Sequence, residues 1–290
     1  MTEQHIPDWR IAFLAITPEM AKDMLAVVVR NRPIRPTMVN VYASDMRNGR
    51  WLFTPEPILV DKNGGVLDGQ HRLQAIVDTG IARPFLVVSN VDPDLIAVIG
   101  IGKSRTAADI LRIGGEKNTG RLAGAARVLH NYLTIPPTYT WSSCNITLSP
   151  PGVTEVLNQH PQLRDCVEVG SRLAPHVLAG PSAVIAALYL TSYEMPIQEQ
   201  GQWLGPLGSG AGLEPGSPAL ALRELYRSLK LGRHKFLQFG TQDRARVTLA
   251  SYLYAWKLWM NGKKSYRLQP PKEIPRVGLP QTTSRPAMGK

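Results

Sequence analysis

The feature that most restricts the fold is a strand-to-helix junction at residues 66–72, which read Val-Leu-Asp-Gly-Gln-His-Arg. A short apolar stretch at 58–60 precedes it, and Asp61-Lys62-Asn63-Gly64-Gly65 has the composition of a turn. Val66-Leu67 then resumes a strand pattern. After Gly69 the spacing becomes helical, with one apolar face made by Leu73, Ile76 and Val77. These residues predict a β-hairpin that leads directly into a helix.

The residue types at this junction favour binding of an anion. A glycine before a helix leaves backbone N–H groups free at the helix N-terminus, where the helix dipole also attracts negative charge. His71 and Arg72 stand in the first helical turn, and Asp68 could order a metal or accept a proton. We therefore predict a phosphate-handling site. The alternative is structural: Asp68 would be an N-cap, Arg72 a surface cation and His71 a solvated side chain.

The stretch Asp68-Gly69-Gln70-His71-Arg72 resembles the Asp-Gly-x-His-Arg signature of the ParB/sulfiredoxin-like superfamily. Sulfiredoxins carry Gly-Cys-His-Arg at this turn, ParB-type partition proteins carry a Gly-Glu-Arg-Arg-like version, and free-serine kinases carry Asp-Gly-His-His-Arg. The resemblance spans roughly residues 15–115, including Asn31-Arg32-Pro33 and Pro55-Glu56-Pro57-Ile58, and continues more loosely into a helical region found in phage and prophage proteins.

The resemblance implies that the turn holds nucleotide phosphates. The expected cofactors are ATP or CTP with Mg²⁺, the Mg²⁺ held by Asp68, and the expected phosphate contacts are Asp68, Gly69, Gln70, His71 and Arg72. Gln70 stands where sulfiredoxins have their reactive cysteine, which excludes sulfinic acid repair by that residue.

Two further places could contribute to such a site. Lys103 and Arg105 could reach phosphates from a neighbouring loop, or could be ordinary surface charges. Gly102-Lys103-Ser104 is not the end of a P-loop, because Ala97 stands where that motif needs a glycine. Glu56 lies between two prolines and could act as a base or a metal ligand, or be an edge carboxylate.

The pattern along the chain predicts an α+β protein. We expect a small mixed α/β domain of ParB/sulfiredoxin type at residues 1–115, bounded by Gly114-Gly115, then an all-α domain at 116–268 with a basic C-terminal helix, and a disordered basic tail at 269–290. Expected helices begin near Thr17 and at residues 37, 70 and 106 in the first part. In the second part they span 116–133, 152–159, 162–174, 182–193, 218–231 and 241–260, with a glycine-rich loop at 205–216.

Charge is distributed unevenly. Residues 223–290 contain 15 Lys and Arg against 3 Asp and Glu, whereas residues 1–222 contain 18 against 19. Such a block is typical of a protein that binds a polyanion, most often nucleic acid; the alternative is a solubilising tail. The proposed DNA contacts are Lys257, Lys263, Lys264 and Arg267. Nearby aromatic residues fit one helical face, which favours a core over a base-stacking surface.

Several classes of protein are disfavoured. No apolar run approaches the roughly 18 residues that a membrane span needs, and residues 1–5 lack the basic start of a signal peptide. Cys144 and Cys166 lie far apart without metal-ligand spacing, so we expect buried thiols and a cytoplasmic protein.

Three functions remain open. The chain could be a nucleotide-dependent DNA-binding protein of ParB type that forms a homodimer. It could be a phosphotransferase acting in phage DNA metabolism or base modification, with Asp68 as base or metal ligand, Glu56 assisting, and His71 and Arg72 neutralising the phosphoryl group. It could be a nuclease using Asp68, Asp61 and Glu56, which ranks last because few carboxylates are present. Asp68 and His71 match the kinase pattern better, and residues 150–200 show no convincing recognition helix.

Overall fold

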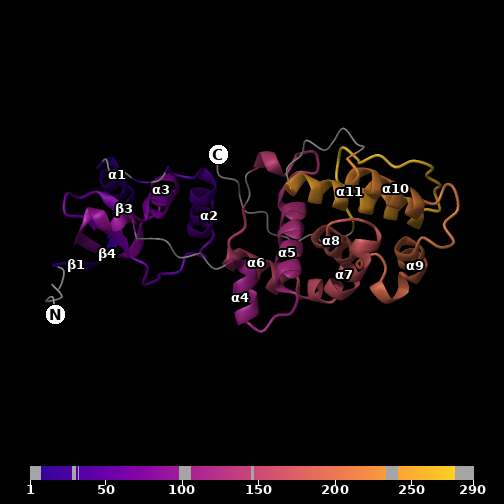
Figure 1. Cartoon of the computed structure of the whole chain (residues 1–290), viewed down its shortest axis with the longest axis horizontal. Helices are drawn as coiled ribbons and strands as arrows, with labels where there is room; N and C mark the ends of the chain where they lie inside the picture. Colours follow the sequence, from indigo (N-terminus) through magenta and orange to yellow (C-terminus); the bar gives the residue numbers. More distant parts are fainter. Residues whose placement is uncertain are drawn as a thin grey trace. The chain divides into compact units, whose positions relative to one another are not determined.

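The computed structural model describes residues 8–27, 31, 33–97, 106–144, 147–232 and 241–277 (Figure 1). The chain divides into two compact units. Unit 1 is Met1–Thr106 with Asn145–Gly152, and unit 2 is Ala107–Cys144 with Val153–Lys290. Unit 1 is mixed α/β and unit 2 is helical, which confirms the α+β class. The division falls after Thr106 and not at Gly114-Gly115, because the helix before those glycines packs on the helix after them.

Unit 1 is built on a four-stranded sheet with the order β1-β4-β2-β3. The strands are β1 (Arg10–Ile16), β2 (Ile58–Asp61), β3 (Val66–Asp68) and β4 (Arg83–Val91). β4 pairs antiparallel with β1 and parallel with β2, whereas β2 and β3 form the antiparallel hairpin that the sequence predicts. Strand β1 is not among the elements that the sequence pattern predicts. This edge strand has no polar alternation, and every side chain in it except Ile16 is exposed.

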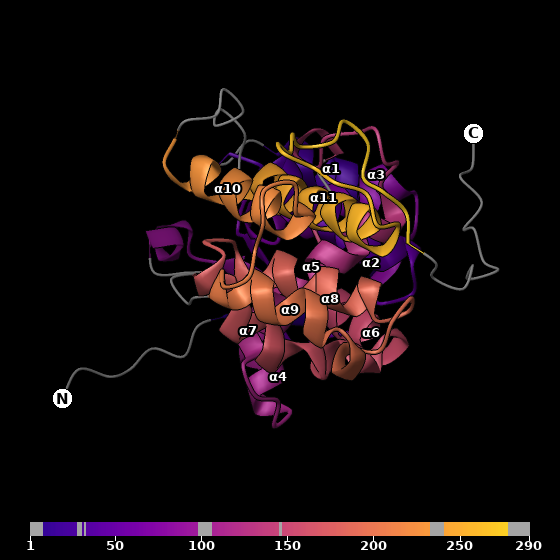
Figure 2. The same ribbon diagram turned by 90° about the vertical axis from the view of Figure 1, so that its right-hand side faces the viewer.

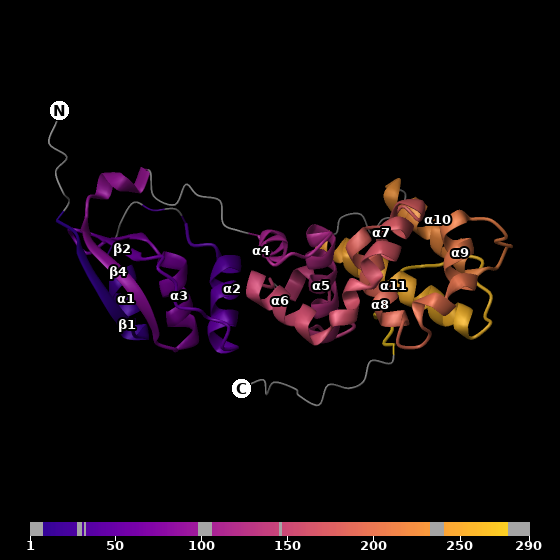
Figure 3. The same cartoon turned by 90° about the horizontal axis from the view of Figure 1, so that it is seen from below.

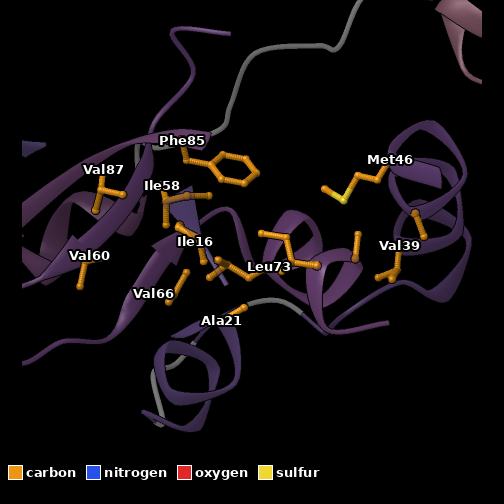
Figure 4. Packing of buried hydrophobic residues seen from close by; sticks show 13 residues of the cluster. Ile16, Ala21, Val39, Met46, Ile58, Val60, Val66, Leu73, Phe85 and Val87 are labelled. Carbon is orange, nitrogen blue, oxygen red and sulfur yellow. The ribbon is translucent and has the colours of Figure 1, made fainter. Parts of the chain in front are cut away.

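In the described part of unit 1 the α-helices α1 (Pro18–Ala26), α2 (Pro36–Arg47) and α3 (Gln70–Thr79) lie beside the sheet (Figure 3). The Thr17 hydroxyl accepts the Met20 N–H at 3.2 Å, and Pro18 follows as the first helical residue, so α1 begins as expected. The short helix η1 (Pro93–Ala97) follows β4. The core lies where Ile16, Ile58 and Leu73, each fully buried, converge from β1, β2 and α3 (Figure 4).

Residues 147–152 return to unit 1 after the first part of unit 2. The Ser149 hydroxyl donates to Asp45 Oδ1 at 2.8 Å, and the same oxygen accepts Arg50 Nε at 3.0 Å. Ser149 also accepts the Gly152 N–H, at 3.1 Å, in the first turn of α6 (Pro150–Gln159). Asp45 is 7% exposed, so this buried carboxylate depends on two partners to compensate for its lost hydration.

Unit 2 is organised around α8 (Pro181–Thr191), which packs against α5 (Thr119–Thr134), α7 (Cys166–His176) and α11 (Thr241–Met260) (Figure 2). Every residue of α8 from Ala183 to Thr191 is buried, as its uniformly apolar sequence predicts. Other elements in the described residues of unit 2 are α4 (Ala107–Ile113), α9 (Gly201–Ser209), α10 (Pro218–Lys230), η2 (Ser142–Cys144), η3 (Pro161–Arg164) and η4 (Ile197–Glu199).

Helix α9 replaces the beginning of the predicted loop at 205–216. Its interior contains Gly205, Pro206 and Gly208, which are poor helix formers. Trp203 and Leu207 are nevertheless fully buried on it. Tertiary packing of these two side chains therefore overrides local propensity.

Tyr252 and Trp256 of α11 form core, as the helical spacing of the aromatic residues favours, whereas Tyr254 is exposed. The Trp203 indole N–H donates to the Tyr252 hydroxyl at 2.9 Å, and the Trp256 indole N–H donates to Glu194 at 2.7 Å. The ring centroids of Trp256 and Trp259 lie 5.1 Å apart. Tyr252 and Trp256 are fully buried, so they do not form a base-stacking surface.

The chain after α11 is not disordered from residue 269, contrary to expectation. Leu268, Ile274 and Val277 are buried, and the Val277 N–H donates to the Tyr132 hydroxyl at 3.0 Å. The Arg276 guanidinium lies 4.6 Å from the Tyr132 ring centroid and donates to the carbonyl oxygens of Tyr132 and Ile135. The order of this segment could not be predicted from the sequence, because it packs through three single apolar residues that have neither helical nor strand spacing and stand among prolines and charges. Residues 278–290 lie outside the described part.

Neither cysteine forms a disulfide, and the two differ in their exposure to solvent. Cys166 is buried, and loss of hydration raises the pKa of its thiol to about 12, whereas Cys144 is only half-buried. Among the described helices, none is both long and apolar enough to cross a membrane.

Candidate functional site

The junction between β3 and α3 depends on Gly69. Its φ of 101° is left-handed, and a Cβ built there would lie 2.3 Å from Ile58 Cδ1. Only glycine fits this combination of backbone conformation and close approach. The Gly69 carbonyl accepts the N–H groups of Arg72 and Leu73 at 2.9 and 3.0 Å. Gly69, not Asp68, is therefore the N-cap residue, and no side chain caps α3.

Arg72 points into the unit and not toward an open face. Its Nη1 donates to the Glu56 carbonyl and its Nη2 to the Pro57 carbonyl, both at 2.8 Å. Nη2 also lies 3.2 Å from Asp68 Oδ2, while the guanidinium carbon lies 6.0 Å from the Phe85 ring centroid. The residue is 8% exposed. This arginine ties the segment before β2 to the start of α3, a role that the residue types alone did not reveal.

His71 is also buried, at 8% exposure. Its Nε2 accepts the backbone N–H of Arg35 at 3.0 Å, which requires Nε2 to be unprotonated. The ring thus fixes the residue that precedes α2. The solvated alternative for His71 is wrong, as is a surface position for Arg72.

The structure brings two residues to the turn that the sequence analysis did not single out as site residues. The Asn31 amide donates to the carbonyls of Val66 and Leu67 at 3.0 and 3.1 Å, so the segment before α2 crosses β3. Arg35 is held by its backbone on His71 and is exposed; its side chain has no partner among the described residues. The sequence gives little indication that Arg35 belongs to this site, because only the folded chain shows that its backbone N–H meets His71.

The carboxylates near the turn differ in availability. Asp68 has a side chain 34% exposed, with Oδ2 on Arg72 and no described partner for Oδ1. Glu56 is exposed, and only its backbone is engaged by Arg72. Asp61 is different: it is 7% exposed, and Oδ1 accepts the N–H groups of Asn63 and Gly65 at 2.7 and 2.8 Å. Asp61 therefore shapes the hairpin turn, which argues against its use as a nuclease metal ligand.

The described residues contain no group of three or more His, Cys, Asp or Glu side chains placed to hold a metal ion. Asp68 could supply one carboxylate ligand to a Mg²⁺ that is otherwise held by phosphate oxygens and water, which is how Mg²⁺ is usually bound. Lys103 and Arg105 lie outside the described residues.

The basic C-terminal block contains two kinds of cation. Lys263, Lys264 and Arg267 are exposed and Lys257 is half-buried; none of their side chains has a partner in the described part of the chain. By contrast, Arg246 is 7% exposed and donates to the carbonyls of Tyr139, Pro137 and Lys272. Arg223 and Arg276 likewise bind backbone carbonyls. Part of the charge excess is therefore structural.

Comparisons with known proteins add little. No protein-family model and no curated protein matches the chain. A search of solved structures finds a likeness to a Pnob8-like ParB-N domain, with 12% identity, coverage of 87% of this chain and 98% of that chain, and a TM-score of 0.22. A TM-score this low carries no weight for fold or function.

Proposed function

We propose that the chain is a ParB-like protein that binds a nucleoside triphosphate, ATP or CTP with Mg²⁺, at the turn Asp68–His71, and nucleic acid through unit 2. The observation that carries the nucleotide half is the start of α3. The helix follows a left-handed glycine, has no side-chain cap, and stands beside a half-exposed carboxylate at the end of a strand. Such a helix end attracts phosphate through its dipole and its N-terminal N–H groups.

The roles of the two arginines follow from their surroundings. Arg72 positions the turn, because its guanidinium already serves two carbonyls and Asp68. Arg35 is the cation proposed to contact the phosphates, since it is exposed and its backbone is anchored to His71. Gln70 is half-buried beside them at the start of α3. Phosphate contact by Arg72 itself would require it to leave these partners.

The nucleic-acid half rests on the exposed cations at the end of α11. Lys263, Lys264 and Arg267 lie within five positions, all exposed and without partners in the described residues. Contacts of this kind recognise the phosphate backbone and not the base sequence.

Phosphoryl transfer is a second proposal, favoured by one observation. Asp68 Oδ1 has no partner among the described residues, so this carboxylate is able to accept a proton or bind Mg²⁺. His71 is a weaker candidate for catalysis, because its Nε2 is occupied by the Arg35 N–H. Asp68→Asn should then abolish release or transfer of labelled γ-phosphate while nucleotide binding persists, and an unchanged rate would exclude the catalytic role.

Calorimetric titration with ATP and with CTP, in the presence of Mg²⁺, tests the nucleotide half. We expect Arg35→Ala to weaken binding by at least tenfold, because one hydrogen bond to a charged group contributes about 1.5–3 kcal/mol. Arg10→Ala is the matched control, because Arg10 is an exposed arginine on β1, at the opposite edge of the sheet from β3. If neither nucleotide binds the wild-type protein, the nucleotide half of the proposal is wrong.

Filter binding of duplex DNA at several salt concentrations tests the other half. Replacing Lys263, Lys264 and Arg267 together by glutamine should make the slope of log K against the logarithm of salt concentration shallower by about 2.7, roughly 0.9 for each lost phosphate contact. Arg10, Lys22 and Lys62, all exposed in unit 1, make a control triple with the same change in charge. If both triple variants change the slope equally, the effect comes from net charge alone, and the assignment of Lys263, Lys264 and Arg267 as DNA contacts is contradicted.

A further inference from the structure

Strand β1 forms one edge of the sheet in unit 1, and it lacks the features that usually protect an edge strand from pairing. Its sequence, Arg-Ile-Ala-Phe-Leu-Ala-Ile, contains no proline and a single charged residue, Arg10, and it pairs with β4 without a bulge. The other edge, β3, is only three residues long and ends in Asp68. No described strand pairs with the outer side of β1, so its backbone N–H and C=O groups on that side can bind an incoming strand.

Large apolar side chains are exposed along this edge. Phe13 is 73% exposed and Ile11 is 67% exposed, and both lie on the same face of the strand because they are two residues apart. Leu14 is exposed on the other face. The Phe13 ring centroid lies 5.9 Å from that of Phe53, and both Phe53 and the preceding Leu52 are more than half exposed. A contiguous apolar surface of this kind usually marks a place where a partner binds.

The exposed apolar area is large enough for a stable interface. It is contributed by side chains on β1, just before it, and in the loop that contacts Phe13: Trp9, Ile11, Phe13, Leu14, Leu52 and Phe53. With roughly 150–250 Å² for each aromatic side chain and somewhat less for each aliphatic one, their exposed parts amount to about 600 Å². Specific interfaces bury about 600–1,000 Å² on each partner, so one copy of this patch reaches the lower limit.

A second copy of the same strand fits this edge. Two β1 strands related by a two-fold axis run antiparallel, so one residue lies opposite its own counterpart. When that residue is Phe13, Ile11 of one copy faces Ala15 of the other. Leu14 then faces Ala12 on the opposite side of the sheet. On each face a large side chain thus lies against a small one, and the two Phe13 rings form an aromatic cross-strand pair.

Charge does not oppose this pairing. In the same register Arg10 lies opposite Ile16, so the two Arg10 residues stand at opposite ends of the paired strands, about 20 Å apart at roughly 3.4 Å per residue. We propose that β1 is a dimerisation strand, which pairs antiparallel with β1 of a second copy, joins the two four-stranded sheets into one and covers Phe13 and Ile11. The interface uses no residue of the turn at 68–71 or of the basic end of α11, so it is independent of the proposed function.

Sedimentation velocity of the full chain measures this self-association, which we expect between about 1 and 100 µM for an interface at the small end of the standard size. Phe13→Lys removes the aromatic pair and places two lysines opposite each other, so it should weaken the dimer by at least about tenfold. Ile113→Lys is the matched control, because Ile113 on α4 is 72% exposed and belongs to unit 2; it should dimerise as wild type. A wild-type chain that stays monomeric, or a Phe13→Lys dimer as strong as the wild-type dimer, overturns the proposal.

Cysteine cross-linking tests the register without depending on the lysine variant. Phe13→Cys places two thiols opposite each other, with Cα atoms about 4.5–5.5 Å apart, so the oxidant diamide should join them in a disulfide. Ile11→Cys should not cross-link to itself, because the two copies of residue 11 lie about 14 Å apart, but it should cross-link to Ala15→Cys in a mixture. Wild type, with Cys144 and Cys166, gives the background. If Phe13→Cys cross-links no more than Ile11→Cys, this edge binds a different occupant and the proposal is wrong.

Discussion

Replacing Arg72 by alanine should destabilise unit 1 strongly, whether or not a ligand is present. The change deletes donors to the Glu56 and Pro57 carbonyls at 2.8 Å and the ion pair with Asp68 at 3.2 Å. Each hydrogen bond to a charged group contributes about 1.5–3 kcal/mol, and loss of one partner from a buried pair costs about 3–5 kcal/mol. Because the Asp68 side chain is 34% exposed, water partly replaces the guanidinium there.

We therefore expect a loss of about 3–5 kcal/mol in the free energy of unfolding of unit 1. That is a large share of the roughly 5–15 kcal/mol that holds a domain together. Hydrogen exchange read by mass spectrometry on peptides from residues 58–79 measures this local stability directly. Arg72→Lys should recover only part of it, since a single ammonium cannot reach all three acceptors in the geometry of the guanidinium fork.

Arg47→Ala is the control, because Arg47 makes one exposed hydrogen bond, at 2.9 Å, to the Asp78 carbonyl. It should cost about 0.5 kcal/mol or less, as surface changes usually do. If Arg72→Ala changes exchange at residues 58–79 by less than about tenfold while nucleotide binding disappears, then Arg72 contacts the ligand and the positioning role is refuted.

Three further changes test other parts of the structure. Gly69→Ala should destabilise unit 1 by about 2–4 kcal/mol, because the backbone there is left-handed and the new Cβ would lie 2.3 Å from Ile58 Cδ1. Adding Ile58→Val removes that Cδ1, so the double variant should recover part of the lost stability in a urea titration. A chain ending at Glu273 should unfold at lower urea than one ending at Val277, because it lacks buried Ile274 and Val277 and the Arg276 hydrogen bonds; equal midpoints would show that the segment does not stabilise unit 2. Burial lowers the pKa of His160 below its usual 6.5, so the unfolded chain binds the proton more readily. Stability of unit 2 should thus be full above about pH 7 and fall as the pH drops through 6.5 toward the lower folded value, and His160→Gln should flatten that decline between pH 7.5 and 5.5.

The elements of unit 1 that carry the junction were predictable because their signals are local. The hairpin of β2 and β3, the glycine that opens α3 and the proline that opens α1 each depend on a few adjacent residues. The roles of Arg72 and His71 were not predictable. The sequence alone does not distinguish a buried arginine that binds backbone carbonyls from an exposed arginine that binds phosphate. Only the fold shows that Arg72 meets the Glu56 carbonyl and that His71 meets the Arg35 N–H.

In unit 2 the reliable signal was uniform hydrophobicity, which placed α8 at the centre. The errors came where tertiary contacts outweigh local preference. Helix α9 keeps Pro206 inside it because Trp203 and Leu207 are buried, and the segment ending at Val277 is ordered by contacts with Tyr132, far away in the sequence. The number of basic residues does not show which of them are available to a ligand. Arg246 is bound to three backbone carbonyls, whereas Lys263 is exposed.

Because residues 147–152 belong to unit 1, this unit cannot be completed during synthesis until the first part of unit 2 has been translated. Asp45 is made early, but the Ser149 hydroxyl that satisfies it emerges only after α4 and α5 have been translated. Until then the Asp45 carboxylate lacks one of its two hydrogen-bond partners, and we expect the nascent first unit to remain loosely packed around α2. A fragment that stops at Thr106 would carry the same defect permanently, whereas covalent attachment of residues 147–152 to such a fragment should restore it.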